Sequence, residues 1–223
     1  MLIVGVYMST IRILSLDPGL TTLGWAISTY DIDKNHLTVH RFGNYKSVKV
    51  AIKDKKQSDR YGVRIIALDL LESTVKSLIA SHKPDYIASE DIFLHIRHIN
   101  AFAALVLCLH AIKHAAYSKD MTVFTIAPRL VKKLAADTGD ADKVAIQKSI
   151  LTNPNITVIE NKQSPIAKMC EHEADAIAVG HAFTIYHLPS LLTPQVTIES
   201  TPIIKRRRRV IKRDTSIVLP IRK

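Results

Sequence analysis

The chain has 223 residues, of which 47% are hydrophobic, and it carries a net charge of +11. This length and apolar content suit one α/β domain with a short extension, and they exclude a disordered or fibrous protein. The two cysteines, Cys108 and Cys170, form no CxxC pair, so neither a disulfide framework nor a structural zinc site is expected. The longest apolar run, residues 101–109, is too short to cross a bilayer, so we expect no membrane span.

Apolar periodicity and the residues that end each apolar run predict five strands and five helices. In chain order they are strands at residues 11–16, 23–29 and 37–45, a helix at 60–81, a strand at 86–89, a helix at 100–117, a strand at 122–126, and helices at 128–136, 140–151 and 171–187. The helix at 100–117 is apolar nearly all round, so we expect it to be deeply packed, and residues 53–59 are expected to be a charged connection. This order predicts an α/β fold with a mixed sheet flanked by helices. No helix follows the first strand, which argues against a dinucleotide-binding fold.

The positive charge is concentrated at the C-terminus. Residues 203–223 hold nine Lys or Arg and one acidic residue, or +8, which leaves +3 for the preceding 202 residues. Seven of the nine are Lys205, Arg206, Arg207, Arg208, Arg209, Lys212 and Arg213. A basic tail indicates a polyanionic partner, with nucleic acid first and an anionic membrane second, or else a solubilising or localisation tail. We therefore expect an N-terminal extension at residues 1–10, a folded domain at 11–188, and a proline-bearing linker with the basic tail at 189–223.

Two carboxylates stand at the ends of predicted strands. Asp17 ends the first strand in the segment Leu-Asp-Pro-Gly, and Glu90 ends the fourth strand. Because α/β proteins usually place their sites at strand ends, both are candidate site residues. Each also has an ordinary interpretation, since Asp before Pro-Gly is common in turns and a strand exit is often exposed. Asp91 follows Glu90 directly, and neighbours on a strand point to opposite faces.

A third acidic group opens the last predicted helix. His172 and Asp175 are three residues apart and share one helix face, and Glu171 and Asp175 form a second pair four residues apart. Acidic residues in a first turn also suit the helix dipole without any further function. From Ala174 onward the helix is almost wholly apolar, so it is expected to be buried, and an acidic start to a buried helix favours a site.

The candidate side chains together offer carboxylate oxygens and one imidazole. Hard Mg²⁺, with Mn²⁺ as a substitute, suits such a donor set. Carboxylates that are brought together repel one another unless a cation binds between them. The chemistry typical of such a cluster is phosphodiester hydrolysis with two metal ions.

These segments resemble the RuvC family of Holliday-junction resolvases. Residues 13–27, where Leu-Asp-Pro-Gly precedes Gly-Trp, resemble its first motif, and residues 84–93 resemble its second. Residues 127–150 resemble its basic region, and residues 172–179 resemble its last motif. The four motifs follow the family order from about residue 11 to 187, which makes the combined signal specific.

The resemblance implies a fold, a site and an activity. It implies an RNase H-like fold, here with a five-stranded mixed sheet, and a homodimer that makes paired nicks at a four-way DNA junction with the help of Mg²⁺. Asp17, Glu90, His172 and Asp175 match the family's metal-binding residues. Some members have aspartate where His172 stands.

Three further residues are assigned by the resemblance. Lys132 and Lys143 match basic residues near the scissile phosphate, although an isolated helix lysine is ordinarily just solvated. Phe93 matches an aromatic residue that stacks on an unpaired base, and its ordinary interpretation is a core residue. The chain departs from the family in its tail and in residues 155–169, which form a longer lead into the last helix.

The predicted function is a crossover junction endodeoxyribonuclease that acts inside the cell on branched DNA, without a membrane or small-molecule partner. One alternative is an RNase H-like nuclease that acts on flaps, forks or RNA–DNA hybrids. The other is a non-catalytic DNA-binding protein of the same fold. The sequence opposes this second alternative, because all four ligand positions hold side chains that bind metals.

Overall fold

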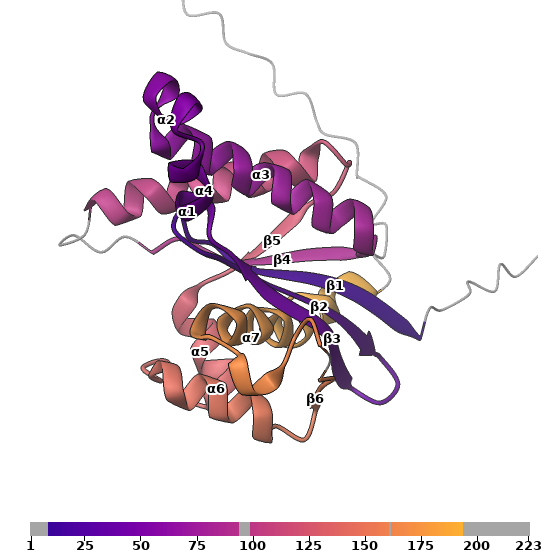
Figure 1. The fold of residues 1–223 in the computed structure, drawn as a ribbon. Coiled ribbons are helices and arrows are strands. Elements are labelled where there is room, and N and C mark those ends of the chain that lie inside the picture. Colours follow the sequence, from indigo (N-terminus) through magenta and orange to yellow (C-terminus); the bar gives the residue numbers. More distant parts are fainter. Residues whose placement is uncertain (1–8, 94–98, 161, 194–223) are drawn as a thin grey trace, which may run out of the picture. The chain divides into compact units, whose positions relative to one another are not determined.

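A computed structural model describes residues 9–93, 99–160 and 162–193 of the chain (Figure 1). Its centre is a mixed sheet of six strands in the order β5-β4-β1-β2-β3-β6. The strands are β1 (Thr10–Asp17), β2 (Leu23–Asp31), β3 (His36–Tyr45), β4 (Tyr86–Glu90), β5 (Val123–Ile126) and β6 (Ile156–Val158). β1, β2 and β3 form an antiparallel meander, while β4, β5 and β6 each pair in parallel with a neighbour. The predicted α/β class with a mixed sheet is therefore confirmed.

The prediction of five strands was wrong by one, because β6 adds a strand to the edge of the sheet. β6 has only three residues, Ile156–Val158, and pairs with Leu37, Thr38 and Val39 of β3. Three residues are too few to show an alternating pattern, and Pro154 and Asn155 before them are typical of a turn.

The helices surround this sheet. They are α1 (Ser47–Lys53), α2 (Lys55–Tyr61), α3 (Val63–His82), α4 (Ile99–Tyr117), α5 (Pro128–Ala136), α6 (Lys143–Thr152), α7 (Glu171–Tyr186) and α8 (Leu188–Leu192). The charged connection expected at residues 53–59 is instead made of the end of α1 and most of α2. Asp54 ends one helix and begins the next, since its side chain accepts a hydrogen bond from the backbone N–H of Gln57.

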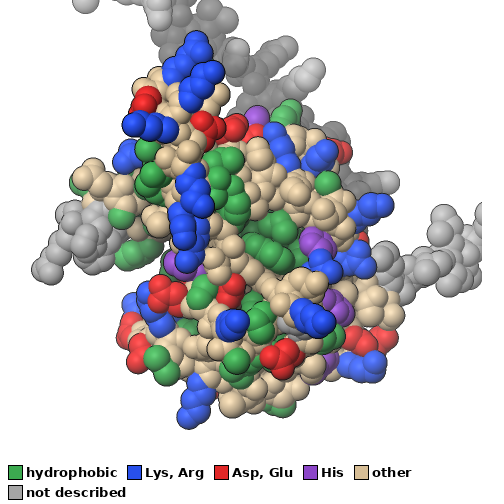
Figure 2. All heavy atoms as spheres, in the orientation of Figure 1, with side chains coloured by type: hydrophobic (Ala, Val, Ile, Leu, Met, Phe, Trp, Pro, Cys, Tyr) green, Lys and Arg blue, Asp and Glu red, His purple; other side chains and the backbone are tan. Residues whose placement is uncertain are grey.

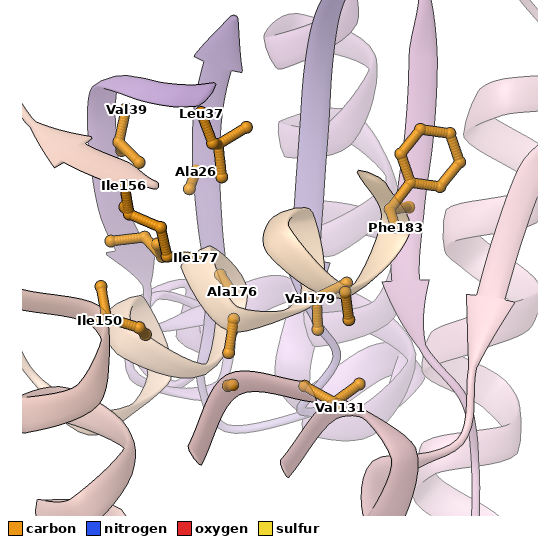
Figure 3. Packing of buried hydrophobic residues seen from close by; sticks show 14 of the residues in the cluster. Ala26, Leu37, Val39, Val131, Ile150, Ile156, Ala176, Ile177, Val179 and Phe183 are labelled. Carbon is orange, nitrogen blue, oxygen red and sulfur yellow. The ribbon is translucent and has the colours of Figure 1, made fainter. Parts of the chain in front are cut away.

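Two hydrophobic clusters lie on the two faces of the sheet. One packs β1 and β4 against α3 and α4, through residues such as Leu14, Leu71 and Ile112. The other packs the opposite face against α7, α5 and α6, and Figure 3 shows Ile177 and Phe183 of α7 within it. α7 buries eleven of its sixteen residues, so its position relative to the sheet is closely fixed.

α4 is less buried than its composition predicts. In its second half Cys108 and Ile112 are fully buried, whereas in its first half Ile99 is 62% exposed and Val106 38%. The expectation of deep packing was therefore wrong for the first half, where the side chains are exposed or only partly buried up to Leu107. By length and composition alone, α4 is the one described helix that could cross a membrane, and its second half packs against α3 and the sheet.

The chain remains helical beyond the predicted end of the domain. α8 spans Leu188–Leu192, includes Pro189 and buries Leu188 almost completely. The compact unit that contains the sheet and its helices ends at Leu192. The predicted basic residues of the tail, from Lys205 to Arg213, lie outside the described residues, as do residues 1–8.

Candidate active site

Asp17 and Glu90 lie next to each other at one edge of the sheet. β1 and β4 are parallel neighbours, and their register pairs Leu16 with Ser89, so the next residue on each strand is one of the two carboxylates. Asp17 is 8% exposed. The two strand ends therefore hold two acidic side chains close together in a poorly solvated position.

The first turn of α7 completes the group because glycine lets it approach the sheet. Gly24 pairs with Asp17 across β1 and β2, and a Cβ at this position would lie 2.0 Å from the carbonyl oxygen of His172. Only a residue without a side chain permits this contact. The approach brings Nδ1 of His172 within 2.7 Å of Oδ2 of Asp17, where the ring nitrogen and the carboxylate share a hydrogen bond.

Glu173 holds the first turn of α7 in place, a role that the sequence did not predict. Its buried carboxylate accepts hydrogen bonds from the backbone N–H of Cys170 at 2.7 Å and from Nδ2 of Asn44 at 2.8 Å. It therefore fixes the start of α7 to β3. The signal was available in the spacing Cys170-x-x-Glu173, which follows the capping-box pattern with cysteine in place of serine or threonine.

Burial and mutual repulsion raise the pKa values of the two carboxylates that lack a close counter-charge. Burial, and then the charges of Asp17 and Asp175, raise the pKa of Glu90 to about 8. Burial, and then the charge of Asp17, raise the pKa of Asp175 to about 6. For His172, the hydrogen bond to Asp17 raises the pKa and favours the imidazolium form. The site thus holds more negative charge than its surroundings stabilise.

Both predicted lysines lie within electrostatic range of these acids. Lys132 of α5 opposes the rise in the pKa of both Glu90 and Asp175. Lys143 of α6 places its Nζ 2.5 Å from Oε2 of Glu171, and this ion pair raises the pKa of the lysine. Lys143 is therefore held at the rim of the site by an acid that is not among the predicted ligands.

Phe93 is an exposed residue and not part of the core. Its side chain is 67% exposed and lines a cavity of about 470 Å³ together with Lys132 and Arg129. The ordinary interpretation of Phe93 as a packing residue is thereby excluded. The predicted basic residues of the tail lie outside the described residues.

The donor set fits a hard divalent cation. Carboxylate oxygens and an imidazole nitrogen are donors that such a cation accepts. Three carboxylates with two raised pKa values also make a site that a cation would stabilise. Among the residues that the structure describes, no three His, Cys, Asp or Glu side chains are yet grouped closely enough to hold a metal ion.

Known proteins resemble the chain over most of the described domain. The family model described as crossover junction endodeoxyribonuclease RuvC matches residues 13–183. A protein of that name from Pasteurella multocida is 33% identical over 113 residues, which cover 51% of this chain and about half, 55%, of the relative. Another from Mannheimia succiniciproducens is 27% identical over 188 residues, covering 84% of this chain and 83% of the relative.

Solved structures share the fold. The RuvC protein of Thermus thermophilus in complex with a Holliday junction substrate superposes with a TM-score of 0.61 at 19% identity, covering 79% of this chain and 94% of that one. The yeast mitochondrial Holliday junction resolvase Ydc2 superposes with a TM-score of 0.56 at 12% identity, covering 78% and 77%. The predicted RNase H-like architecture is thereby confirmed.

Proposed function

The chain belongs to the RuvC family of crossover junction endodeoxyribonucleases, and we propose that it resolves four-way DNA junctions by paired, metal-dependent nicks. The observation that carries this proposal is the position of Asp17, Glu90, His172 and Asp175 at one edge of the sheet, within the span that matches the family. A non-catalytic role fits this arrangement poorly, because the repulsion between the clustered carboxylates destabilises the fold and no structural role is evident that would require it.

Asp17, Glu90, His172 and Asp175 are the proposed ligands of Mg²⁺, and two ions per site match the donor count. Bound Mg²⁺ would supply an activated water and charge stabilisation at the leaving oxygen. In the metal-free chain the hydrogen bond to Asp17 raises the pKa of His172 and favours its imidazolium form, so an ion that bound this ring would displace a proton from it. Glu173 keeps the helix that carries His172 and Asp175 fixed to the sheet.

Lys132 and Lys143 are the proposed phosphate-binding residues. A cation at the rim of an acidic site offsets the repulsion between the site and the DNA backbone, and it stabilises charge that develops on the phosphate. Lys143 would exchange its ion pair with Glu171 for the scissile phosphate. Phe93, exposed beside Lys132, would stack on a base at the centre of the junction.

Paired nicks on opposite strands require two active sites, so we propose that the protein acts as a homodimer. The exposed apolar side chains on the first half of α4, such as Ile99, Val106 and Leu107, support this proposal because burial against a second copy would stabilise the pair. The basic tail would add sequence-independent contacts to DNA, and the protein would act inside the cell, where branched DNA forms.

The test is cleavage of an immobile four-way junction with Mg²⁺ or with a chelator, mapped on all four strands. We expect nicks at related positions on two opposite strands, only with metal. Flap, fork, three-way and RNA–DNA hybrid substrates with the same sequences serve as controls. Faster cutting of a hybrid or flap than of the junction would contradict the proposal, and so would the absence of metal-dependent nicking.

A further inference from the structure

The segment between β3 and α3 consists of two short helices that contribute little to the core. α1 buries only Ser47 and Ala51, and α2 buries no residue. Figure 1 shows α2 at the N-terminal end of α3, away from the sheet. Burial in the core therefore does not account for the residues found on α2 and on the exposed face of α1.

This segment carries a dense positive charge. Residues 46–64 contain seven basic and two acidic residues, or +5, whereas the first 202 residues together carry only +3, so the rest of that part of the chain sums to −2. All seven basic side chains are exposed: Lys46, Lys49, Lys53, Lys55, Lys56, Arg60 and Arg64. None of them takes part in the ion pairs found among the described residues. We call these seven residues the α1–α2 basic surface, and Figure 2 shows Lys and Arg side chains gathered over these helices.

The α1–α2 basic surface begins at the candidate active site. β3 ends at Tyr45, which pairs with Leu23 of β2, one step along the ladder from Gly24 and so close to Asp17. Lys46 and His172 line one cavity of about 420 Å³. From that cavity α1 and then α2 lead away from the site, and each is about 10 Å long, the length of about three base pairs of DNA.

We propose that the α1–α2 basic surface binds the phosphate backbone of a duplex arm that runs outward from the cut site. The inference rests on the proposed function, since it assigns the arm to the same branched substrate. A duplex is the occupant that fits, because the surface combines positive charge outside the ion pairs of the described residues with direct continuity to a site for phosphodiester cleavage. The contacts would be independent of base sequence, and they would hold the scissile strand in register with Asp17.

Two variants with equal changes in charge test the inference. The first is Lys49→Gln, Lys53→Gln, Lys56→Gln and Arg60→Gln, in which every altered side chain is exposed. The control is Lys83→Gln, Lys113→Gln, Lys119→Gln and Lys162→Gln, which removes the same charge from exposed positions elsewhere. Both retain the basic tail, Lys132 and Lys143. Thermal melting of each variant against the parent protein establishes that both remain folded.

The measurement is affinity for a long-armed four-way junction over a range of salt concentrations, without metal. Each lost phosphate contact removes about 0.9 from the slope of log K against log salt, so the first variant should flatten that slope by about 3 to 4. The control should leave the slope nearly unchanged. Trimming the junction arms to stubs too short to reach α2 should remove the difference between the parent protein and the first variant.

Several results would overturn the inference. These are an unchanged slope in the first variant, an equal loss in the control, and a defect that persists with trimmed arms. Tighter binding to anionic lipid vesicles than to DNA, lost in the first variant, would assign the surface to a membrane instead. Cleavage by the parent protein with Mg²⁺ is recorded separately, so arm binding without junction cleavage would refute the proposed function and leave this inference standing.

Discussion

The first turn of α7 and the α1–α2 basic surface adjoin the same edge of the sheet, but they are built in opposite ways. Around the first turn of α7 and the neighbouring strand ends, acidic side chains lie close together, and burial, followed by the charges of Asp17 and Asp175, raises the pKa of Glu90 to about 8. On α1 and α2, basic side chains stand in solvent and α2 has no buried residue. The comparison teaches that burial fixes the geometry of the reacting groups, whereas exposed charge governs affinity and its dependence on salt. Substitutions in the two regions should therefore fail in different ways.

The largest effect is expected from removal of a ligand charge. Asp17→Asn keeps the shape of the side chain but loses the charge that a divalent cation needs, so cleavage of a four-way junction with Mg²⁺ should fall by about a thousandfold or more. Junction binding without metal should be kept, because the change lowers the repulsion of DNA. The same is expected of Glu90→Gln and Asp175→Asn.

Asp91→Asn is the matched control for this series. Asp91 directly follows Glu90, but its carboxylate accepts a hydrogen bond from the neighbouring backbone N–H of Ile92 and is not a candidate ligand. Near-normal cleavage by Asp91→Asn, with loss of cleavage in the variants of Asp17, Glu90 and Asp175, would support the proposed assignment of the ligands. Normal cleavage by Asp17→Asn would refute the assignment of the ligands.

The close approach of α7 to β2 can be broken without touching a charge. Gly24→Ala would put a Cβ 2.0 Å from the carbonyl oxygen of His172, so the first turn of α7 must shift. We expect a loss of about 2 to 3 kcal/mol in the free energy of unfolding, and a fall in cleavage of about a hundredfold from displaced site residues. Chemical denaturation and the junction cleavage rate measure the two effects.

Gly180→Ala is the control for packing alone, because its Cβ would meet Oγ of Ser15 at 2.9 Å about two turns further along α7. It should reduce stability with a much smaller effect on cleavage at saturating substrate. Equal losses of activity in the two glycine variants would show that cleavage follows general stability and not the position of the first turn.

The elements that form the site could be predicted because each has a strong local pattern. β1 and β4 are apolar runs that end in a carboxylate, and α7 is an apolar helix with an acidic start. Their order along the chain implied a mixed sheet, and the motifs implied the family. The parallel register that puts Asp17 beside Glu90 is a long-range property, and only the structure supplied it.

The elements that were not predicted lack a strong local pattern of apolar residues. β6 is too short to show a period, and α2 buries no residue, so its charged sequence resembled a loop. The exposure of Phe93 and of the first half of α4 depends on contacts with segments far away in the sequence, and composition does not reveal such contacts. The role of Glu173 depends on Asn44, which lies far away in the sequence.

A smaller effect is expected from Phe93, which is exposed like the α1–α2 basic surface but lies beside the candidate active site. Phe93→Ala should reduce junction cleavage by about tenfold, because stacking on a base contributes about 1 to 3 kcal/mol. Its 67% exposure predicts little change in the melting temperature. Tyr117→Ala, which removes an aromatic ring that is 79% exposed on α4, is the control and should cleave normally. A clear drop in melting temperature for Phe93→Ala would contradict the exposed position of the ring.

The smallest effect is a gradual dependence of stability on pH in the metal-free protein. The pKa of Glu90 is about 8 in the folded chain, whereas an unfolded glutamate titrates near its ordinary value of about 4.3. Between these values the folded state keeps a proton that the unfolded state has lost, so stability is full below the unfolded pKa and declines as pH rises. The contribution of one such group is at most about 1.4 kcal/mol for each pH unit.

Denaturation at several pH values in the presence of a chelator measures this slope. Glu90→Gln should reduce it, because the amide cannot lose a proton, and Mg²⁺ should reduce it in the parent protein by favouring the charged carboxylates. Glu72→Gln is the control, since ion pairing with Lys76 lowers the pKa of Glu72 and places its titration below this range. If Glu90→Gln and the parent protein had the same slope between pH 5 and 8, the carboxylate of Glu90 would be better solvated than its position beside Asp17 implies. The distinction between a buried acidic site and an exposed basic surface would then rest on geometry alone.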